Sequence, residues 1–137
     1  MEHVRVIDRT VHTTHEWLSR LTHESELQDE EHAYAVLRAT LHGLRDRIGP
    51  DVAVHLAAQL PLLLKGTFYE GWDPRATPQR LDLDAFVRRV EDEANLGSSA
   101  AAISSARAVC QLLEEEFAPG TMEHVRAVLP SDFSVLL

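Results

Sequence analysis

The residues of this chain repeat at a fixed spacing of 69 positions, without a gap. Residues 14–68 align with residues 83–137, and 12 of the 55 aligned positions are identical, where chance gives about three or four. The retained residues include two prolines and a histidine in each copy: Pro50 with Pro119, Pro61 with Pro130, and His55 with His124. A unit this small cannot bury much core by itself, so we expect the two halves to share one core.

Apolar residues recur at helical spacing along the first half of the chain. Thr13 and Glu16 have the spacing of a capping box, which predicts a first helix over about residues 14–25. Asp29 is suited to cap a second helix that runs to about Ile48, where Gly49 ends it.

Prolines and polar caps divide the rest of the chain. Pro50 suits the opening of a third helix, and Pro61 predicts a break before a short fourth helix. Asp82 and Ser98 mark the starts of equivalent helices in the second half. Residues 71–78 contain one Gly and two Pro, which predicts a loop between the halves.

No segment alternates with a period of two, so we expect no sheet. The predicted fold is all-α, a duplicated unit of three to four helices arranged as a pseudo-twofold helical bundle. We divide the chain into an N-terminal extension (1–12), a first helical repeat (13–70), a linker loop (71–81) and a second helical repeat (82–137), which together form one compact domain.

The composition disfavours several classes of partner. A net charge of −9 disfavours binding to nucleic acid and to anionic membranes. Residues 1–15 lack the apolar run of a signal peptide, and the longest apolar run, residues 60–64, is too short to span a bilayer. Cys110 is the only cysteine, so the chain forms no internal disulfide, and we expect a cytoplasmic location.

Several stretches of the sequence resemble a known family. The most specific is the run at residues 58–74, AQLPxLLKGxFYEGWDP, and residues 14–18, 33–47 and 86–90 also fit. The chain resembles the bacterial family catalogued as domain of unknown function 2267 over about residues 13–137. This resemblance implies a small, all-helical cytoplasmic protein, and it brings no catalytic residues with it.

His12, His15 and His23 lie close together on one face of the first predicted helix. Imidazoles at this spacing can share a transition metal. The alternative is a solvated polar face that happens to contain histidines. We favour this alternative because Trp17 and Leu18 lie opposite and no cysteine or carboxylate cluster matches the three histidines.

His55 and His124 occupy the same position in the two repeats, one turn before a Leu-Pro break. Each could be a core histidine that binds the helix end by a hydrogen bond. Alternatively, the two could form a paired active or metal site on the pseudo-twofold axis. Retention in both repeats favours the structural role.

Arg38 and Arg107 are also retained in both repeats, on the flank of the long helix of each. An arginine there usually covers apolar surface with its stem and pairs with a carboxylate. Glu24 and Glu93 are retained as well, so we expect structural ion pairs with them. Anion binding is the alternative.

An aromatic segment, residues 65–72, has no good counterpart in the second half. Lys65, Phe68, Tyr69 and Trp72 could act as interface anchors beside the loop. Alternatively, the aromatic rings hold the linker to the core. A feature found in only one copy of a duplicated unit is a candidate for an added role, so we treat these four residues as a candidate interaction site.

The sequence contains no carboxylate pair, catalytic triad, phosphate loop or zinc spacing, and it implies no cofactor. We therefore favour a non-enzymatic protein-interaction or regulatory module with an unidentified protein partner. The alternative is a small-ligand or metal-binding protein, or an enzyme, that uses the histidines. The sequence leaves homo-oligomerisation open.

Overall fold

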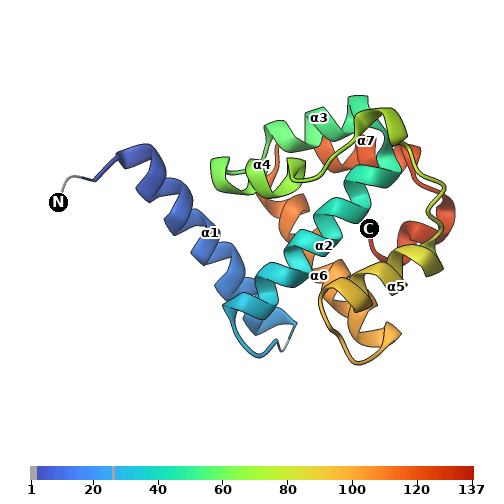
Figure 1. Cartoon of the computed structure of the whole chain (residues 1–137), viewed down its shortest axis with the longest axis horizontal. Coiled ribbons are helices and arrows are strands. Elements are labelled where there is room, and N and C mark those ends of the chain that lie inside the picture. The colour runs from blue at the N-terminus through green and yellow to red at the C-terminus, as the bar shows by residue number, and fades with distance from the viewer. Residues whose placement is uncertain (1–2, 26) are drawn as a thin grey trace.

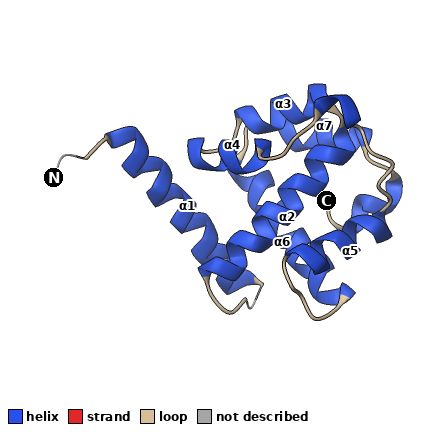
Figure 2. Cartoon of the chain, in the orientation of Figure 1, coloured by secondary structure: helices blue, strands red, loops and turns tan. Residues whose placement is uncertain are grey.

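A computed structural model describes residues 3–25 and 27–137 of the chain. All regular elements in these residues are helical, as Figure 2 shows, and the prediction of an all-α fold is confirmed. The elements are α1 (Arg5–Glu24), α2 (Glu30–Ile48), α3 (Pro50–Ala58), α4 (Leu62–Tyr69), the 3-10 helix η1 (Pro74–Ala76), α5 (Leu83–Glu93), α6 (Ser99–Glu116), α7 (Thr121–Val128) and the 3-10 helix η2 (Ser131–Val135).

Helix α1 begins well before the predicted start near residue 14. Its first residue is Arg5, preceded by Val4, whose side chain makes no capping hydrogen bond. Thr13 lies inside the helix, and the carboxylate of Glu16 pairs with His12 instead of closing a capping box. The predicted start was wrong because apolar residues at helical spacing continue upstream of Thr13, and this longer pattern outweighs one local capping signal.

The other helix ends agree with the sequence. The side chain of Asp29 accepts a hydrogen bond in the first turn of α2, and Gly49, with a φ of +86°, ends that helix. Pro61 separates α3 from α4. In the second half, Asp82 and Ser98 cap α5 and α6 through their side chains. Each of these residues acts on backbone groups within one helical turn, so the local sequence is sufficient to place the helix end.

The elements of the two repeats follow each other in the same order. Helix α1 ends at Glu24 and α5 ends at Glu93, which is the aligned position; α2 begins at Glu30 and α6 at the aligned Ser99. One difference is that α4 of the first repeat corresponds to the 3-10 helix η2 in the second.

The two repeats interlock around the long helices α2 and α6, which contact each other (Figure 1). Helices α1 and α5 each pack against both long helices, and α3 packs against α7. This set of contacts is unchanged when the repeats are exchanged, as a pseudo-twofold arrangement requires. Superposition of the two units stays a prediction.

Aromatic side chains join the repeats within one core. The rings of Trp17 on α1 and Phe117 after α6 lie 6.5 Å apart, between centroids. Phe86 on α5 packs edge-on against Phe133, at 5.5 Å, and also against Gly43 of α2. A methyl group at Gly43 would lie 2.6 Å from Cε2 of Phe86, so the two helices pack closely only because residue 43 has no side chain.

Candidate interaction surface

Helix α4 and the loop after it contain the aromatic segment. Phe68 is fully buried in the core, Tyr69 keeps 37% of its surface exposed, and Trp72 is half-buried. The ring of Tyr69 lies 5.4 Å from that of Phe68 and 5.3 Å from that of Trp72. The Phe68 ring therefore packs in the core, while Lys65, Tyr69 and Trp72 are partly exposed and could contact a partner.

Side chains of α2 hold the end of α4 in place. The Nε2 of His42 donates to the carbonyl of Thr67 at 2.6 Å, and Nη1 of Arg45 donates to the carbonyls of Phe68 and Glu70, both at 2.8 Å. The last carbonyls of a helix lack partners within the helix, and a cation there also complements the helix dipole. His42 and Arg45 therefore fix the direction in which the chain leaves α4.

Arg45 belongs to a buried charge cluster. Its guanidinium contacts both carboxylate oxygens of Asp46, at 2.8 and 3.2 Å, and Nη2 of Arg89 on α5 contacts Oδ2 of Asp46 at 2.7 Å. Burial by itself raises the pKa of Asp46, but the hydrogen bonds from Arg45 and Arg89 outweigh this effect and the pKa is lowered. The cluster joins α2, α4 and α5, and its charged atoms bind one another, which is the arrangement of a structural network.

The first turns of α1 contain a surface that the sequence analysis missed. Val4, directly before α1, and Ile7 and Val11 within it continue the row of buried residues on this helix at alternating spacings of three and four: Thr14, Leu18 and Leu21. Figure 1 shows that this end of α1 projects away from the body. Val4, Val6, Ile7 and Val11 therefore keep between 39% and 56% of their surface exposed. The regular spacing of the row was the signal that could have revealed this surface.

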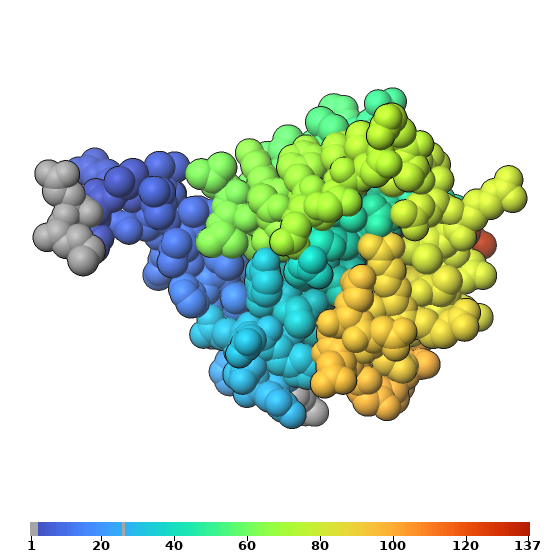
Figure 3. All heavy atoms as spheres, in the orientation of Figure 1, coloured from blue at the N-terminus to red at the C-terminus, as the bar shows by residue number. Residues whose placement is uncertain are grey.

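The start of α4 extends the same apolar surface. Leu62 and Leu63 are 54% and 38% exposed, and the backbone N–H of Leu63 donates to Oγ1 of Thr10 on α1 at 2.9 Å. Figure 3 shows the projecting blue atoms of α1 beside the green atoms of α4. We call the six exposed residues the α1–α4 surface: Val4, Val6, Ile7, Val11, Leu62 and Leu63.

A hollow of about 340 Å³ lies within this surface, between α1 and the turn from α3 to α4. Apolar residues form most of its wall: Val6, Trp17, Leu60, Pro61 and Leu62. Arg9 and Glu116 contribute one charge of each sign to its lining.

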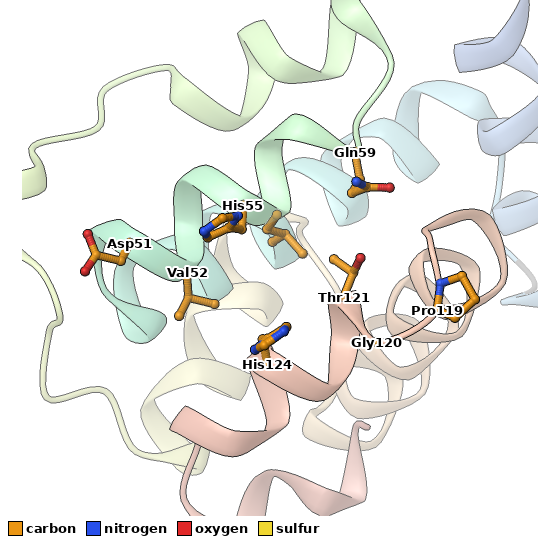
Figure 4. A pocket seen from close by; sticks show the side chains of 9 residues that line it. Asp51, Val52, His55, Gln59, Pro119, Gly120, Thr121 and His124 are labelled. Atoms are coloured by element: carbon orange, nitrogen blue, oxygen red, sulfur yellow. The ribbon is translucent and has the colours of Figure 1, made fainter.

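The repeated histidines line a separate cavity. His55 on α3 and His124 on α7 face a space of about 420 Å³ between these two helices, and Figure 4 shows them on opposite walls. Both imidazoles are exposed, and no hydrogen bond from either ring occurs among the described residues. The expectation of hydrogen-bonded core histidines was wrong, because the side of α3 and α7 that contains them faces the cavity. Asp51, Gln59 and Thr121 add further polar groups to the lining.

The face of α1 that contains the other histidines is exposed, as a solvated polar face should be. His12 pairs with Glu16 at 3.1 Å and His15 with Glu30 at 2.8 Å, while His23 lies at the exposed end of the helix. Within residues 3–25 and 27–137, no three His, Cys, Asp or Glu residues lie close enough to hold a metal ion together. Metal binding by His12, His15 and His23 stays a hypothesis.

Arg38 and Arg107 have matching positions but partners other than those expected. Nη2 of Arg38 pairs with Glu70 at 2.7 Å, and Nε of Arg107 donates to the carbonyl of Val135 at 2.8 Å. Each arginine thus connects the long helix of its repeat to the end of that repeat. The retained glutamates pair one turn away on their own helices, Glu24 with Arg20 and Glu93 with Arg89.

Cys110 is buried on the inner side of α6. Burial, with a smaller contribution from Glu114, raises the pKa of its thiol to about 12. The thiol is therefore protonated at neutral pH and is a poor nucleophile.

These features define an all-helical protein with one uncovered apolar helix end, and none of its described helices is long and apolar enough to cross a membrane. Residues 14–136 match the family described as Uncharacterized conserved protein (DUF2267). The chain belongs to this family, which confirms the resemblance seen in the sequence. The match begins after Val11, so the projecting turns of α1 lie outside it. No curated protein matches the chain.

Proposed function

We propose that this protein is a non-enzymatic interaction module that binds another protein through its α1–α4 surface. The proposal rests on one observation. The apolar row of α1 is buried against the other helices at Thr14, Leu18 and Leu21, but it continues as exposed residues toward the N-terminal end of the helix. Apolar side chains in water are a source of free energy for association, and contiguous exposed apolar patches mark contact sites.

The internal repeat supports a specific role for this end of α1. Helix α5 begins at Leu83, which aligns with Thr14, whereas α1 begins at Arg5. Residues 5–13 therefore have no counterpart in the second repeat. Thr10 in this stretch binds α4, but the exposed apolar residues Val6, Ile7 and Val11 are not needed for that contact. A separate function therefore explains these exposed residues better than packing does.

The outward face of α4 extends the proposed contact toward the aromatic segment. Leu62, Gly66 and Tyr69 lie on one face of that helix, at spacings of four and three residues. Trp72 follows beside Tyr69, and Lys65 lies at the edge of the same face. Aromatic side chains are enriched at interface contacts. Trp72 offers only ring surface there, because its Nε1 is buried and has no hydrogen-bond partner among the described residues.

The test is a pull-down from the source cells with the untagged chain coupled to a support. We expect the wild-type protein to retain specific partners, which can include copies of itself, and the double variant Ile7→Glu/Leu62→Glu to lose them because the charges oppose burial of the surface. Val128→Glu on α7 is the matched control, since Val128 is 41% exposed but lies outside the surface.

Both variants change exposed residues, so each should keep its free energy of unfolding within about 0.5 kcal/mol of wild type. Equal retention of every partner by the double variant and the control would refute the proposal.

A second candidate function is small-ligand binding in the cavity between α3 and α7. The observation that favours it is that His55 and His124, aligned in the two repeats, face the same space. Titration of zinc and of small carboxylates, followed by NMR, should shift the signals of both histidines if this candidate is right. Unchanged signals of both histidines would contradict this candidate, and so would an unchanged affinity for the same ligand in the double variant His55→Ala/His124→Ala.

A further inference from the structure

We infer that the cavity between α3 and α7 binds a small monocarboxylate, whose carboxylate group lies between the imidazoles of His55 and His124. This inference rests on the second candidate function and names the chemical class of its ligand. Binding of a protein at the α1–α4 surface does not depend on it.

The cavity has the size and the lining of a small-molecule site. Its volume of about 420 Å³ falls within the range of such sites. Val52, His55 and Leu56 lie on one face of α3, so this helix supplies an imidazole and apolar surface together. Pro119 adds apolar surface beside α7. A ligand in this space can therefore cover an apolar group while its polar atoms reach a histidine.

The repeat places equivalent residues on the two walls of the cavity. His55 aligns with His124, and Val52 aligns with Thr121. Neither imidazole is buried or bonded to another described residue, so packing does not explain why both copies keep a histidine here. A ligand that both rings bind does explain it.

The other polar groups of the lining add hydrogen-bond donors. The Oε1 of Gln59 accepts from the backbone N–H of Ala118 at 3.2 Å, and its NH2 group can donate to a ligand. The hydroxyl of Thr121 can also donate, and an imidazole has one N–H when neutral and two when protonated. A carboxylate accepts hydrogen bonds at both oxygens, so imidazoles on opposite walls can bind one carboxylate together.

The acidic content of the lining is small. Among the described residues that line the cavity, Asp51 is the only carboxylate, and Asp51, His55 and His124 are the only titratable ones. Figure 4 shows the carboxylate of Asp51 turned away from His124. No three His, Cys, Asp or Glu residues of the described chain lie close enough to hold a metal ion, and two imidazoles alone make a poor metal site. The lining therefore favours an anion over a metal ion.

Titration of the untagged full-length chain with benzoate, followed by NMR of the histidine rings, tests the inference. Benzoate should shift the signals of His55 and His124 with a dissociation constant of about 0.1 to 10 mM, and it should leave His23 on α1 unchanged. Benzamide has the same ring without the charge, so it should bind at least about tenfold more weakly. Equal affinities for benzoate and benzamide, or no shift of either cavity histidine, overturn the inference.

Two variants should have opposite effects on the affinity for benzoate. His55→Ala/His124→Ala should lower it at least about tenfold, because the charge-assisted hydrogen bonds are lost. Asp51→Asn should raise it about twofold, because a like charge is removed. His23→Ala is the matched control and should leave it unchanged. All four side chains are exposed, so each variant should stay folded. Wild-type affinity in the double variant, or weaker binding by Asp51→Asn, contradicts a carboxylate held by the histidines.

The affinity for benzoate should also depend on pH. Imidazoles gain positive charge as the pH falls from about 8 to about 6, whereas benzoate stays ionised. Binding should therefore become tighter over this range and take up protons, which calorimetry in buffers of different ionisation enthalpy measures. The double variant should show neither effect. Binding without proton uptake in the wild type rules out a carboxylate between the two imidazoles.

The inference and the candidate function fail separately. If zinc shifts the signals of both histidines and benzoate does not, the cavity binds a ligand of another class, and only the inference is overturned. If neither zinc nor benzoate shifts them, both are overturned.

Discussion

Two arginines of α2 reach the same segment of the chain but differ in burial. Arg45 is only 4% exposed and binds Asp46 and two carbonyls at the end of α4. Arg38 contacts the carboxylate of Glu70 at the surface, where water competes for both charges. Loss of a buried charge leaves its partners without replacement hydrogen bonds, whereas loss of an exposed one lets water take its place.

We therefore predict that Arg45→Ala lowers the free energy of unfolding by about 3 to 5 kcal/mol, as for other broken buried pairs. The matched variant Arg38→Ala should lower it by no more than about 1 kcal/mol. Urea denaturation measures both. Equal decreases in the free energy of unfolding for the two variants would contradict the prediction that burial makes the contacts of Arg45 more stabilising than those of Arg38.

His42 makes the stability depend on pH. Burial lowers its pKa from the ordinary value of 6.5, the hydrogen bond to the carbonyl of Thr67 acts in the opposite direction, and Arg45 lowers it further. The unfolded chain therefore binds a proton at a higher pH than the folded chain does. The contribution of His42 is fully present above pH 6.5 and is lost as the pH falls through the lowered pKa of the folded state.

We predict that His42→Gln reduces the loss of stability between pH 7.5 and about pH 5, because glutamine can still donate to the carbonyl but does not titrate. Urea midpoints measured across this range give the comparison. Asp46 does not interfere, since its pKa lies below the ordinary value of 3.8. If the urea midpoints of the variant and the wild type fall in parallel with pH, His42 is not the source of the pH-dependent loss of stability.

At the scale of the elements, two glycines inside helices have opposite surroundings. Gly43 of α2 lies against the ring of Phe86 on α5, while no atom outside the helix lies within 4 Å of a Cβ built on Gly66 of α4. The first glycine permits two helices to approach, and the second only weakens its helix.

Alanine should therefore have opposite effects at the two positions. Gly43→Ala should destabilise the protein by about 1 to 3 kcal/mol through overpacking, whereas Gly66→Ala should stabilise it by up to about 1 kcal/mol. Thermal and urea unfolding measure both changes. Phe86→Leu should reduce the cost of Gly43→Ala in a double-mutant cycle, and strictly additive effects would argue against the contact.

At the scale of the whole molecule, each repeat completes the core of the other. Helix α1 packs on α6 as well as on α2, and α5 packs on α2 as well as on α6. Neither half closes its own core, which is why a small helical unit is stable here as a pair. The start of α1 stands apart, because residues 5–13 extend beyond the 69-residue sequence repeat and provide part of the α1–α4 surface.

The helical class, the repeat and most helix ends can be read from the amino-acid sequence alone. Asp29, Gly49, Pro61 and Ser98 act on backbone groups within one turn, so their effects are local and readable along the chain. The start of α1 was missed because a capping-box spacing at Thr13 competed with a longer apolar row.

The accessibility of the side chains and the identity of their partners depend on the packing of the helices. Phe68 and Tyr69 are neighbours in an aromatic run, yet one is buried and the other partly exposed. His55 faces a cavity, and Arg38 meets Glu70 rather than the expected Glu24. These outcomes depend on how helices distant in the sequence pack together, because packing determines which part of each apolar or polar face remains in contact with water.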